Sequence, residues 1–302
     1  MEPRTVVFIL SLPRSGSTLL GHFLGSHPDV MYSGEIPSPL KKGHPVRCRY
    51  CGNDTCPVWG KMLDPPFVHR CYRTQQSFGR GVARRVTAGI RRKTDEYQPP
   101  GALFQRVFKA DPDTHVIVDS SKDLSWVDWN RATQEYESRF VFLLRDLRGV
   151  VSSLRRNNDQ PIRRTIRRAT GSLQRLRRYV KRLPAGQVLT VRYEDLTEQP
   201  DSFGRTVCDF LHIPFDRRMK EFYRYPSHVI GGNCGPVLQC RITAGRDPDG
   251  LRPYAADSLR AFYLNRSVSI LSDDRWKHEL NAAALQTFET EAGACNRSLG
   301  YT

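Results

Sequence analysis

The chain has 302 residues, of which 39% are hydrophobic and 10% aromatic, so it can bury a sizeable core and is not a disordered polymer. Its formal net charge of +16 at pH 7 indicates an anionic partner: a polyanionic cofactor, an acidic polymer, nucleic acid or a membrane surface. No apolar run is long enough to span a bilayer and no signal sequence is recognisable, so we expect a cytoplasmic protein without a transmembrane segment.

The first predicted element is a buried strand that leads into a glycine-containing turn. Residues 6–20 read VVFILSLPRSGSTLL, an apolar β-branched run followed by a turn and the start of an amphipathic helix. Backbone N–H groups of such a turn and of the helix N-terminus point at one anion. A Walker A loop would place lysine where Ser17 stands, whereas the cation here is Arg14, before Gly16. The turn therefore predicts a nucleotide-phosphate site unlike that of standard ATPases and GTPases.

This strand, the PRSGST turn and the helix resemble the 5′-phosphosulfate loop of sulfotransferases that use 3′-phosphoadenylyl sulfate (PAPS). The resemblance extends to bacterial-type, carbohydrate and tyrosylprotein sulfotransferases. It implies that PAPS is a co-substrate and that no metal is required, because cationic side chains supply the positive charge. The residues that it assigns to the 5′ end of PAPS are Arg14, Ser15, Gly16, Ser17 and Thr18.

Glu35 lies next along the chain, in the segment SHPDVMYSGEIP. A carboxylate close to the phosphosulfate can take the proton of an attacking hydroxyl group. Tyrosylprotein sulfotransferases carry their catalytic glutamate after a similar segment, and the resemblance places that role on Glu35. His22 and His27 are alternative bases, for which we prefer a structural role.

Residues 36–100 interrupt the alternation of strands and helices, and we expect an irregular Cys- and Arg-rich insertion over the active-site crevice. It contains CRYCGNDTCPVW, in which Cys48 and Cys51 have the spacing of a zinc knuckle and Cys56 follows. The candidates for a fourth ligand are Cys71, His44 and His69. Because a second recognisable ligand pair is missing, the sequence favours reduced or bridged cysteines over structural zinc.

The next strand carries the sequence VIVDSSKD and delivers Lys122 to its carboxyl end. A sulfonyl group in transfer spreads negative charge over its oxygens and the departing phosphate oxygen, and fixed cations lower that barrier. The resemblance implies that Lys122 and Arg14 are electrostatic catalysts and that Glu35 is the base. The alternative function is a P-loop kinase-like phosphotransferase, in which Asp119 would be the metal-binding acid.

A further strand and helix carry RFVFLLRDLRGVVSSLRR. Arg145 at the strand end and Ser153 two turns along the helix can converge on one phosphate. The resemblance assigns them to the 3′-phosphate of PAPS. In the same way, the later segment VRYEDL resembles the family element whose tyrosine lies near the adenine, which implies that role for Tyr193.

A strongly basic helix is predicted between these two motifs, because apolar residues recur every three or four positions from Ile162 to Val180. Residues 155–182 include eleven Arg or Lys, so its other faces are basic. We suggest that this surface gathers an acidic acceptor such as a uronate- or sulfate-bearing glycan. Without clustered aromatic residues for base stacking, specific nucleic-acid recognition is disfavoured, and the alternative is a non-enzymatic binder of anionic polymers.

These elements predict an α/β fold: a P-loop-like parallel sheet flanked by helices, in a single sulfotransferase domain of residues 1–302. The strands are expected at residues 5–10, 115–119, 139–144 and 188–191, and helices at 16–26, 101–110, 125–137, 147–157, 162–183, 202–211 and 279–292. The resemblance implies an enzyme that moves sulfonate from PAPS to an acceptor hydroxyl on a carbohydrate or another small or polymeric acceptor. The sequence leaves the acceptor's identity open.

Overall fold

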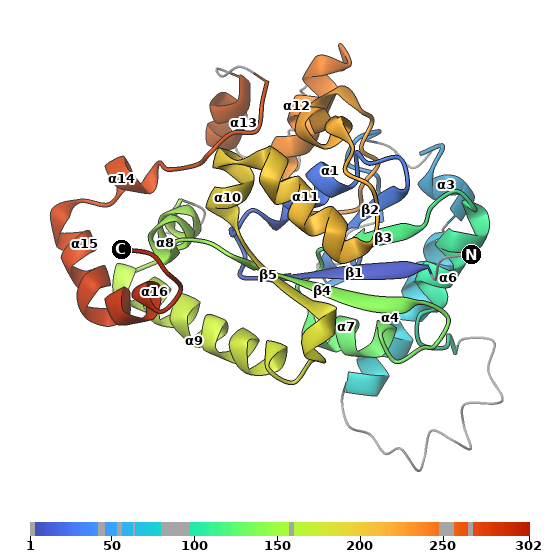
Figure 1. Ribbon diagram of the computed structural model, residues 1–302, viewed down its shortest axis with the longest axis horizontal. Coiled ribbons are helices and arrows are strands. Elements are labelled where there is room, and N and C mark those ends of the chain that lie inside the picture. The colour runs from blue at the N-terminus through green and yellow to red at the C-terminus, as the bar shows by residue number, and fades with distance from the viewer. Residues whose placement is uncertain are drawn as a thin grey trace. The chain divides into compact units, whose positions relative to one another are not determined.

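A computed structural model describes residues 4–41, 46–52, 56–62, 64–79, 97–156, 160–247, 257–264 and 268–302 of the protein. Its centre is a five-stranded parallel sheet with strand order β2-β3-β1-β4-β5, flanked by helices (Figure 1). The strands are β1 (Thr5–Ser11), β2 (Val30–Gly34), β3 (Val116–Asp119), β4 (Glu137–Leu144) and β5 (Val188–Arg192). The predicted α/β class is confirmed.

The strands form where apolar, largely β-branched residues occur in uninterrupted runs, as expected for a parallel sheet that is covered on both faces. All seven residues of β1 and all four of β3 are buried. The two strands pair in parallel from Thr5 opposite Val116 to Phe8 opposite Asp119. The four strands expected from the sequence are present, and their ends differ by no more than two residues.

Strand β2, on the other side of β3, was not among the expected strands. It is short and ends at Gly34, which has a φ of +86°. A Cβ atom at this position would lie 2.4 Å from the carbonyl oxygen of Ile230, so only glycine fits. The strand therefore ends in a turn that packs directly against the backbone of a distant segment.

The chain forms two compact units, the first comprising residues 1–8, 21–139 and 216–269 and the second comprising residues 9–20, 140–215 and 270–302. Helix α1 (Ser17–Leu24) has residues in both units. The other helices of the first unit are α2 (Pro37–Lys41), α3 (Trp59–Met62), α4 (Pro65–Gly79), α6 (Ala102–Ala110), α7 (Leu124–Asn130), η2 (Arg217–Arg224), α12 (Cys234–Thr243) and α13 (Asp257–Leu264).

Helix α4 lies in the stretch that was expected to be irregular, and it packs against α6 and α7. The core beside it is aromatic: the ring of Phe104 makes edge contacts with Trp126 and Tyr136 at centroid distances of 6.4 and 6.2 Å. Such contacts bury large apolar surfaces in favourable ring geometries. Part of the insertion is thus regular structure that belongs to the core of its unit.

The second unit contains β5, most of β4 and the predicted basic helix, α9. Its helices are α8 (Leu147–Arg155), α9 (Ile162–Val180), η1 (Ala185–Gln187), α10 (Tyr193–Glu198), α11 (Pro200–Leu211), α14 (Trp276–Glu279), α15 (Ala282–Phe288), η4 (Glu289–Gly293) and α16 (Ala294–Arg297). Helix α9 packs against α8, α15 and η4. Among the helices that the structure describes, none is long and apolar enough to cross a bilayer.

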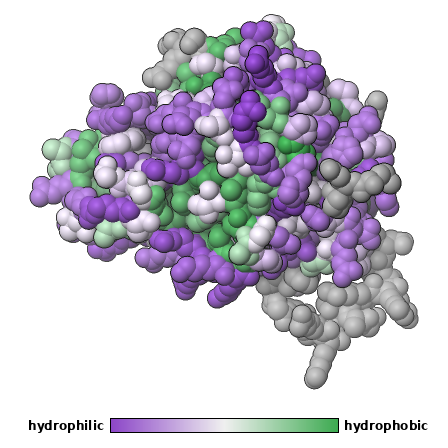
Figure 2. Space-filling view, viewed as in Figure 1, coloured by the Kyte–Doolittle hydropathy of each residue, from purple (hydrophilic) through white to green (hydrophobic). Residues whose placement is uncertain are grey.

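The surface of α9 has the predicted division into one apolar and several basic faces. Its buried residues are Thr165, Ile166, Ala169, Leu173 and Leu176, which recur at helical spacing. On the face shown in Figure 2, hydrophilic side chains cover the edge where Figure 1 places α9.

Candidate active site

The turn between β1 and α1 has the tight backbone geometry of an anion-binding loop. Arg14 and Gly16 have positive φ angles of 72° and 89°. A Cβ atom on Gly16 would lie 2.3 Å from Cδ2 of Tyr193, so this position also requires glycine. Ser17 and Thr18 follow as buried residues in the first turn of α1. The five residues predicted to bind the 5′ end of PAPS therefore form one compact loop and helix start.

Arg145 connects this loop to the turn after β4. Its side chain is only 6% exposed, and its Nη1 donates a hydrogen bond of 2.8 Å to the carbonyl oxygen of Arg14. The guanidinium group also lies over the ring of Tyr193, 4.4 Å from the centroid. The structure thus brings Arg14, Arg145 and Tyr193 together, although they come from three separate sequence motifs.

Tyr193 itself is buried, and its hydroxyl group is held by the C-terminal segment. The hydroxyl donates to the carbonyl oxygen of Leu271 at 3.1 Å and accepts from the backbone N–H of Asp273 at 3.0 Å. With Gly16 against its ring and Arg145 over it, this side chain positions the arginine. Its contact with adenine stays a prediction.

Three arginines surround the carboxylate of Asp273. Its Oδ1 lies 2.6 Å from Nε of Arg275, and its Oδ2 lies 3.2 Å from Nη2 of Arg156 and 3.6 Å from Nη2 of Arg145. Burial raises the pKa of Asp273, but the hydrogen bond from Arg275 and the three positive charges outweigh burial and hold that pKa well below its usual range. Asp273, Arg156 and Arg275 were not among the predicted site residues, although Arg156 ends the same sequence motif that contains Arg145.

Ser153 lies buried on α8, the helix that begins after Arg145. The start of this helix is fixed by Asp146, whose carboxylate caps the N–H of Arg148 at 2.8 Å. Asn296 accepts a hydrogen bond from the N–H of Leu147 at 2.9 Å. The C-terminal end of the chain therefore helps to hold the helix that carries Ser153.

Glu35 and Lys122, the proposed base and cation, form an ion pair in the first unit. Nζ of Lys122 lies 2.5 Å from Oε1 of Glu35 and donates to the carbonyl oxygen of Ser120 at 2.8 Å. Both side chains are mostly buried: 14% of the Lys122 side chain and 17% of the Glu35 side chain are exposed. The N–H of Glu35 donates to the carbonyl oxygen of Ile230 at 2.6 Å, so a distant segment fixes its backbone.

The alternative bases His22 and His27 occupy structural positions. Burial lowers the pKa of His22 to about 3, and its ring packs against Tyr32 and Phe222. Nδ1 of His27 accepts a hydrogen bond of 3.1 Å from the N–H of Asp29. Both rings are almost fully enclosed, which supports the structural role that was preferred for them.

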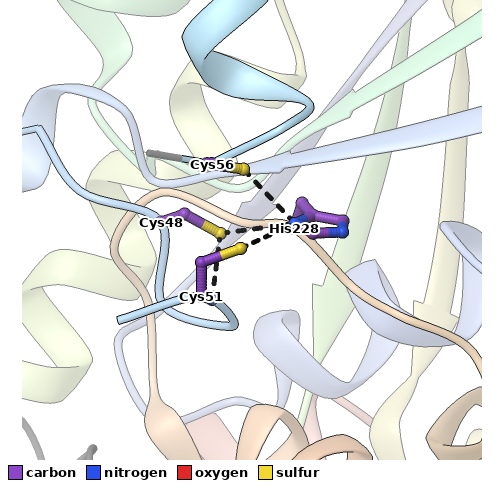
Figure 3. A group of neighbouring side chains, drawn as sticks. All are labelled: Cys48, Cys51, Cys56 and His228. Atoms are coloured by element: carbon purple, nitrogen blue, oxygen red, sulfur yellow. Dashed lines mark hydrogen bonds between the residues drawn. The ribbon is translucent and has the colours of Figure 1, made fainter. Parts of the chain in front are cut away.

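A cluster of three cysteines and one histidine also lies in the first unit (Figure 3). Sγ of Cys48, Cys51 and Cys56 lie 3.7, 3.3 and 3.3 Å from Nδ1 of His228. The fourth member is His228 rather than Cys71 or His69, which is a correction to the expected ligand set; His44 lies outside the described residues. The sequence favoured reduced or bridged cysteines over zinc at this place, and in the structure all three cysteines are free thiols.

Comparison with known proteins gives these residues a family. The sequence matches the model of the sulfotransferase family over residues 6–48 and 136–217. Over these two segments, which make up 125 of its 302 residues, the chain is similar to the sulfotransferase family. The matched segments contain the loop at Arg14, Glu35, Arg145 and Tyr193, whereas Lys122 lies outside them.

Individual relatives of this chain are distant. An uncharacterized protein of Aquifex aeolicus is 25% identical over 224 residues, which are 72% of this chain and 27% of that protein. A putative protein-tyrosine sulfotransferase of Caenorhabditis briggsae is 23% identical, over 71% of this chain and 68% of its own length. The solved sulfotransferase domain of the Synechococcus PCC 7002 olefin synthase is 20% identical with a TM-score of 0.48, over 96% of this chain and 95% of that one. The chain thus spans about a quarter of the Aquifex relative.

Proposed function

We propose that this sulfotransferase moves the sulfonate group of PAPS to an acceptor hydroxyl, on a carbohydrate or another small or polymeric acceptor. The observation that carries the proposal is the hydrogen bond from Arg145 to the backbone of Arg14. It joins the loop after β1 to the turn after β4, the two elements predicted to bind opposite ends of one doubly phosphorylated adenylate. Arg14 and Arg145 are 131 positions apart in the sequence, so the fold brings these two elements together.

In this proposal, the loop from Arg14 to Thr18 holds the 5′-phosphosulfate, and Arg145 with Ser153 holds the 3′-phosphate. The arginines around Asp273 support the second assignment, because they form an assembled anion site whose positive charge one internal carboxylate only partly offsets. A phosphate carries more negative charge and more acceptor oxygens than a carboxylate. It can therefore compete with Asp273 for the guanidinium group of Arg145.

The transfer step forms one S–O bond and breaks another. The acceptor oxygen attacks sulfur, the bond from sulfur to the 5′-phosphate oxygen breaks, and 3′-phosphoadenosine 5′-phosphate (PAP) leaves. Glu35 takes the acceptor proton, using the carboxylate oxygen that is not bonded to Lys122. Lys122 and Arg14 stabilise the charge that develops on the sulfonate and the departing phosphate oxygen.

The kinase-like alternative receives no support from Asp119, its candidate metal-binding acid. Asp119 is 1% exposed, and its carboxylate accepts hydrogen bonds from Ser121 and from the indole N–H of Trp126. A carboxylate enclosed in this way has no oxygen directed at a hydrated magnesium ion. Asp119 is instead a structural residue at the end of β3.

The nucleotide assignment is tested by calorimetric titration with PAP and with ADP, which lacks the 3′-phosphate. We expect PAP to bind at least about tenfold more tightly than ADP, because a charge-assisted phosphate site contributes about 1.5–3 kcal/mol. Arg145→Lys keeps the charge but loses the planar fork, and should reduce this preference. Asp273→Asn removes the competing carboxylate and should tighten PAP binding.

Arg178→Lys provides a matched control, since it makes the same exchange on an exposed part of α9 and should leave PAP affinity unchanged. Equal affinity of the wild-type protein for PAP and ADP would contradict the 3′-phosphate assignment. Stabilisation by ATP and magnesium alone would contradict the whole proposal. Once PAP binding is established, transfer from ³⁵S-labelled PAPS to pools of glycans, peptides and small hydroxyl compounds identifies the acceptor class.

A further inference from the structure

The four side chains in Figure 3 have the spacing of ligands around one metal ion. All four potential ligand atoms of Cys48, Cys51, Cys56 and His228 lie within 4.8 Å of one another. For tetrahedral zinc with ordinary Zn–S and Zn–N bonds, the distance from sulfur to nitrogen is about 3.6 Å. The three distances from sulfur to Nδ1 of His228 are 3.3, 3.3 and 3.7 Å, which bracket that value.

Hydrogen bonding does not account for this arrangement. A ring nitrogen of histidine either donates one hydrogen bond or accepts one, and sulfur is a weak partner in both roles. Nδ1 of His228 nevertheless lies within 3.7 Å of three sulfur atoms at once. Four donors that converge on a common centre are the arrangement that a cation requires.

The surrounding backbone is arranged to support sulfur ligands. The N–H of Cys51 points at Sγ of Cys48 at 3.5 Å, and the N–H of Trp59 points at Sγ of Cys56 at 3.4 Å. Such donors stabilise thiolates, which are the metal-binding form of cysteine. The indole N–H of Trp59 also donates to the carbonyl oxygen of His228 at 2.8 Å, which fixes the segment that carries the histidine.

We propose that Cys48, Cys51, Cys56 and His228 bind one structural Zn²⁺ ion. Binding displaces one proton from each of the three thiols and uses the lone pair of neutral His228, so three protons leave for each zinc bound and no electron is transferred. Three thiolates and one imidazole in a tetrahedron are ligands typical of zinc rather than of magnesium or calcium, which prefer oxygen. With four protein ligands the site is closed, so its role is structural and not catalytic.

This zinc site also supports Glu35, a consequence that rests on the proposed function. The segment after His228 runs beside β2: Ile230 accepts the N–H of Glu35 at 2.6 Å and donates to the carbonyl oxygen of Ser33 at 3.1 Å. Cys48 forms an antiparallel bridge with the same Ile230. Zinc would therefore tie the Cys48 segment to the segment of Ile230 that holds the backbone of Glu35, which makes the zinc ligands positioning residues for the proposed base.

The site is tested by the metal content of protein purified under reducing conditions, measured by mass spectrometry. We expect one zinc per chain in the wild type, and its loss in Cys51→Ser and His228→Ala. Cys295→Ser is the control, because this cysteine belongs to the other unit and should leave the zinc in place. Replacement of zinc by cobalt should give the visible absorption of a tetrahedral thiolate site.

Titration of the unmutated protein with a thiol reagent tests the zinc site even if the variants do not fold. A mercurial thiol reagent should release one zinc as three cysteines react, detected with a metal-sensitive dye. Folded protein that contains no stoichiometric metal, that contains iron instead, or that has a disulfide within the cluster would overturn the zinc site.

The role in positioning Glu35 is tested separately, by removing zinc and measuring both PAP affinity and turnover. We expect turnover to fall while PAP affinity stays, because the proposed nucleotide residues belong to the second unit. Unchanged turnover would overturn the positioning role. A zinc-loaded protein that does not bind PAP would contradict the proposed function and leave the metal site standing.

Discussion

Asp119 is a buried carboxyl group whose ionisation should be visible in the pH dependence of stability. Burial raises its pKa to about 6, despite hydrogen bonds from Ser121 and Trp126 that favour the ionised form. A carboxyl group whose pKa is higher in the folded state stabilises the fold fully below its unfolded pKa near 4 and loses that contribution as the pH rises through about 6. The shift corresponds to about 3 kcal/mol.

The expected result is a free energy of unfolding that falls, relative to Asp119→Asn, as the pH rises from about 4 to about 7. Denaturant unfolding of both proteins at several pH values measures this difference, and the comparison cancels the effects of other titrating groups. A difference that stays flat over this range would show that Asp119 does not titrate there.

Glu35 and Lys122 form a pair in which replacement of either residue should impair the transfer step. Glu35→Gln keeps the shape and one oxygen that can accept from Lys122, but it removes the base, so kcat should fall by about 10²–10⁴-fold. Lys122→Ala should also lower kcat far more than it weakens PAP binding, because the lysine acts on charge that develops during transfer. Circular dichroism checks the fold, and normal turnover of Glu35→Gln would refute its role as base.

At the residue scale, local sequence patterns marked most of the candidate residues, because most of them stand at a strand end or turn; Ser153, within α8, is an exception. Arg14 and Gly16 are examples, and the structure gives both the left-handed backbone that such a turn requires. His228 was missed because it lies 172 positions after Cys56, with no neighbouring ligand to form a recognisable pair. His228 comes close to the three cysteines only when the chain folds.

At the element scale, predictions succeeded where one hydrophobic period dominates the sequence and failed where an element has a mixed sequence or is very short. Helix α9 repeats its apolar residues regularly, and the predicted stripe is buried from Ile166 to Leu176 and half-buried at its two ends. Helix α4 begins with two prolines and carries mixed Cys, Arg and polar residues, so its 15-residue span was read as irregular. Strand β2 is only five residues long and is completed by its pairing with β3.

The basic faces of α9 lead to a prediction that the structure makes sharper. Arg167 pairs with Glu291 at 3.0 Å, and Arg163 lies 4.0 Å from the same carboxylate, so changes at these two positions would also disturb the contact with η4. Reversal of charge at Arg164 and Arg168 is the better experiment. We expect a higher KM for an acidic glycan acceptor, with kcat little changed, and an effect that weakens as salt screens the charges.

The control is Lys109→Glu, a charge reversal at an exposed position on α6 in the other unit. It should leave KM unchanged. A KM for the acidic acceptor that does not respond to the Arg164 and Arg168 reversals at low salt would remove the proposed role of this surface.

At the scale of the whole molecule, each unit is built from segments that lie far apart in the sequence, which local patterns do not reveal. The proposed nucleotide residues all belong to the second unit, and the proposed zinc ligands all belong to the first. The two ligands should therefore stabilise different sets of segments. Hydrogen exchange measured by mass spectrometry separates them, because it reports local opening segment by segment.

Saturating PAP should slow exchange in residues 12–18, 145–153 and 270–275. Occupancy at 100 times the dissociation constant stabilises the bound state by about 2.7 kcal/mol, which allows up to about a 100-fold slowing where opening requires release of the ligand. Removal of zinc should instead speed exchange in residues 46–52 and 226–231. ADP should protect residues 12–18 but affect 270–275 less than PAP does, since it lacks the 3′-phosphate. Protection by PAP that is absent from residues 12–18 would place the nucleotide elsewhere and contradict the assignment of Arg14 and Arg145 to one ligand.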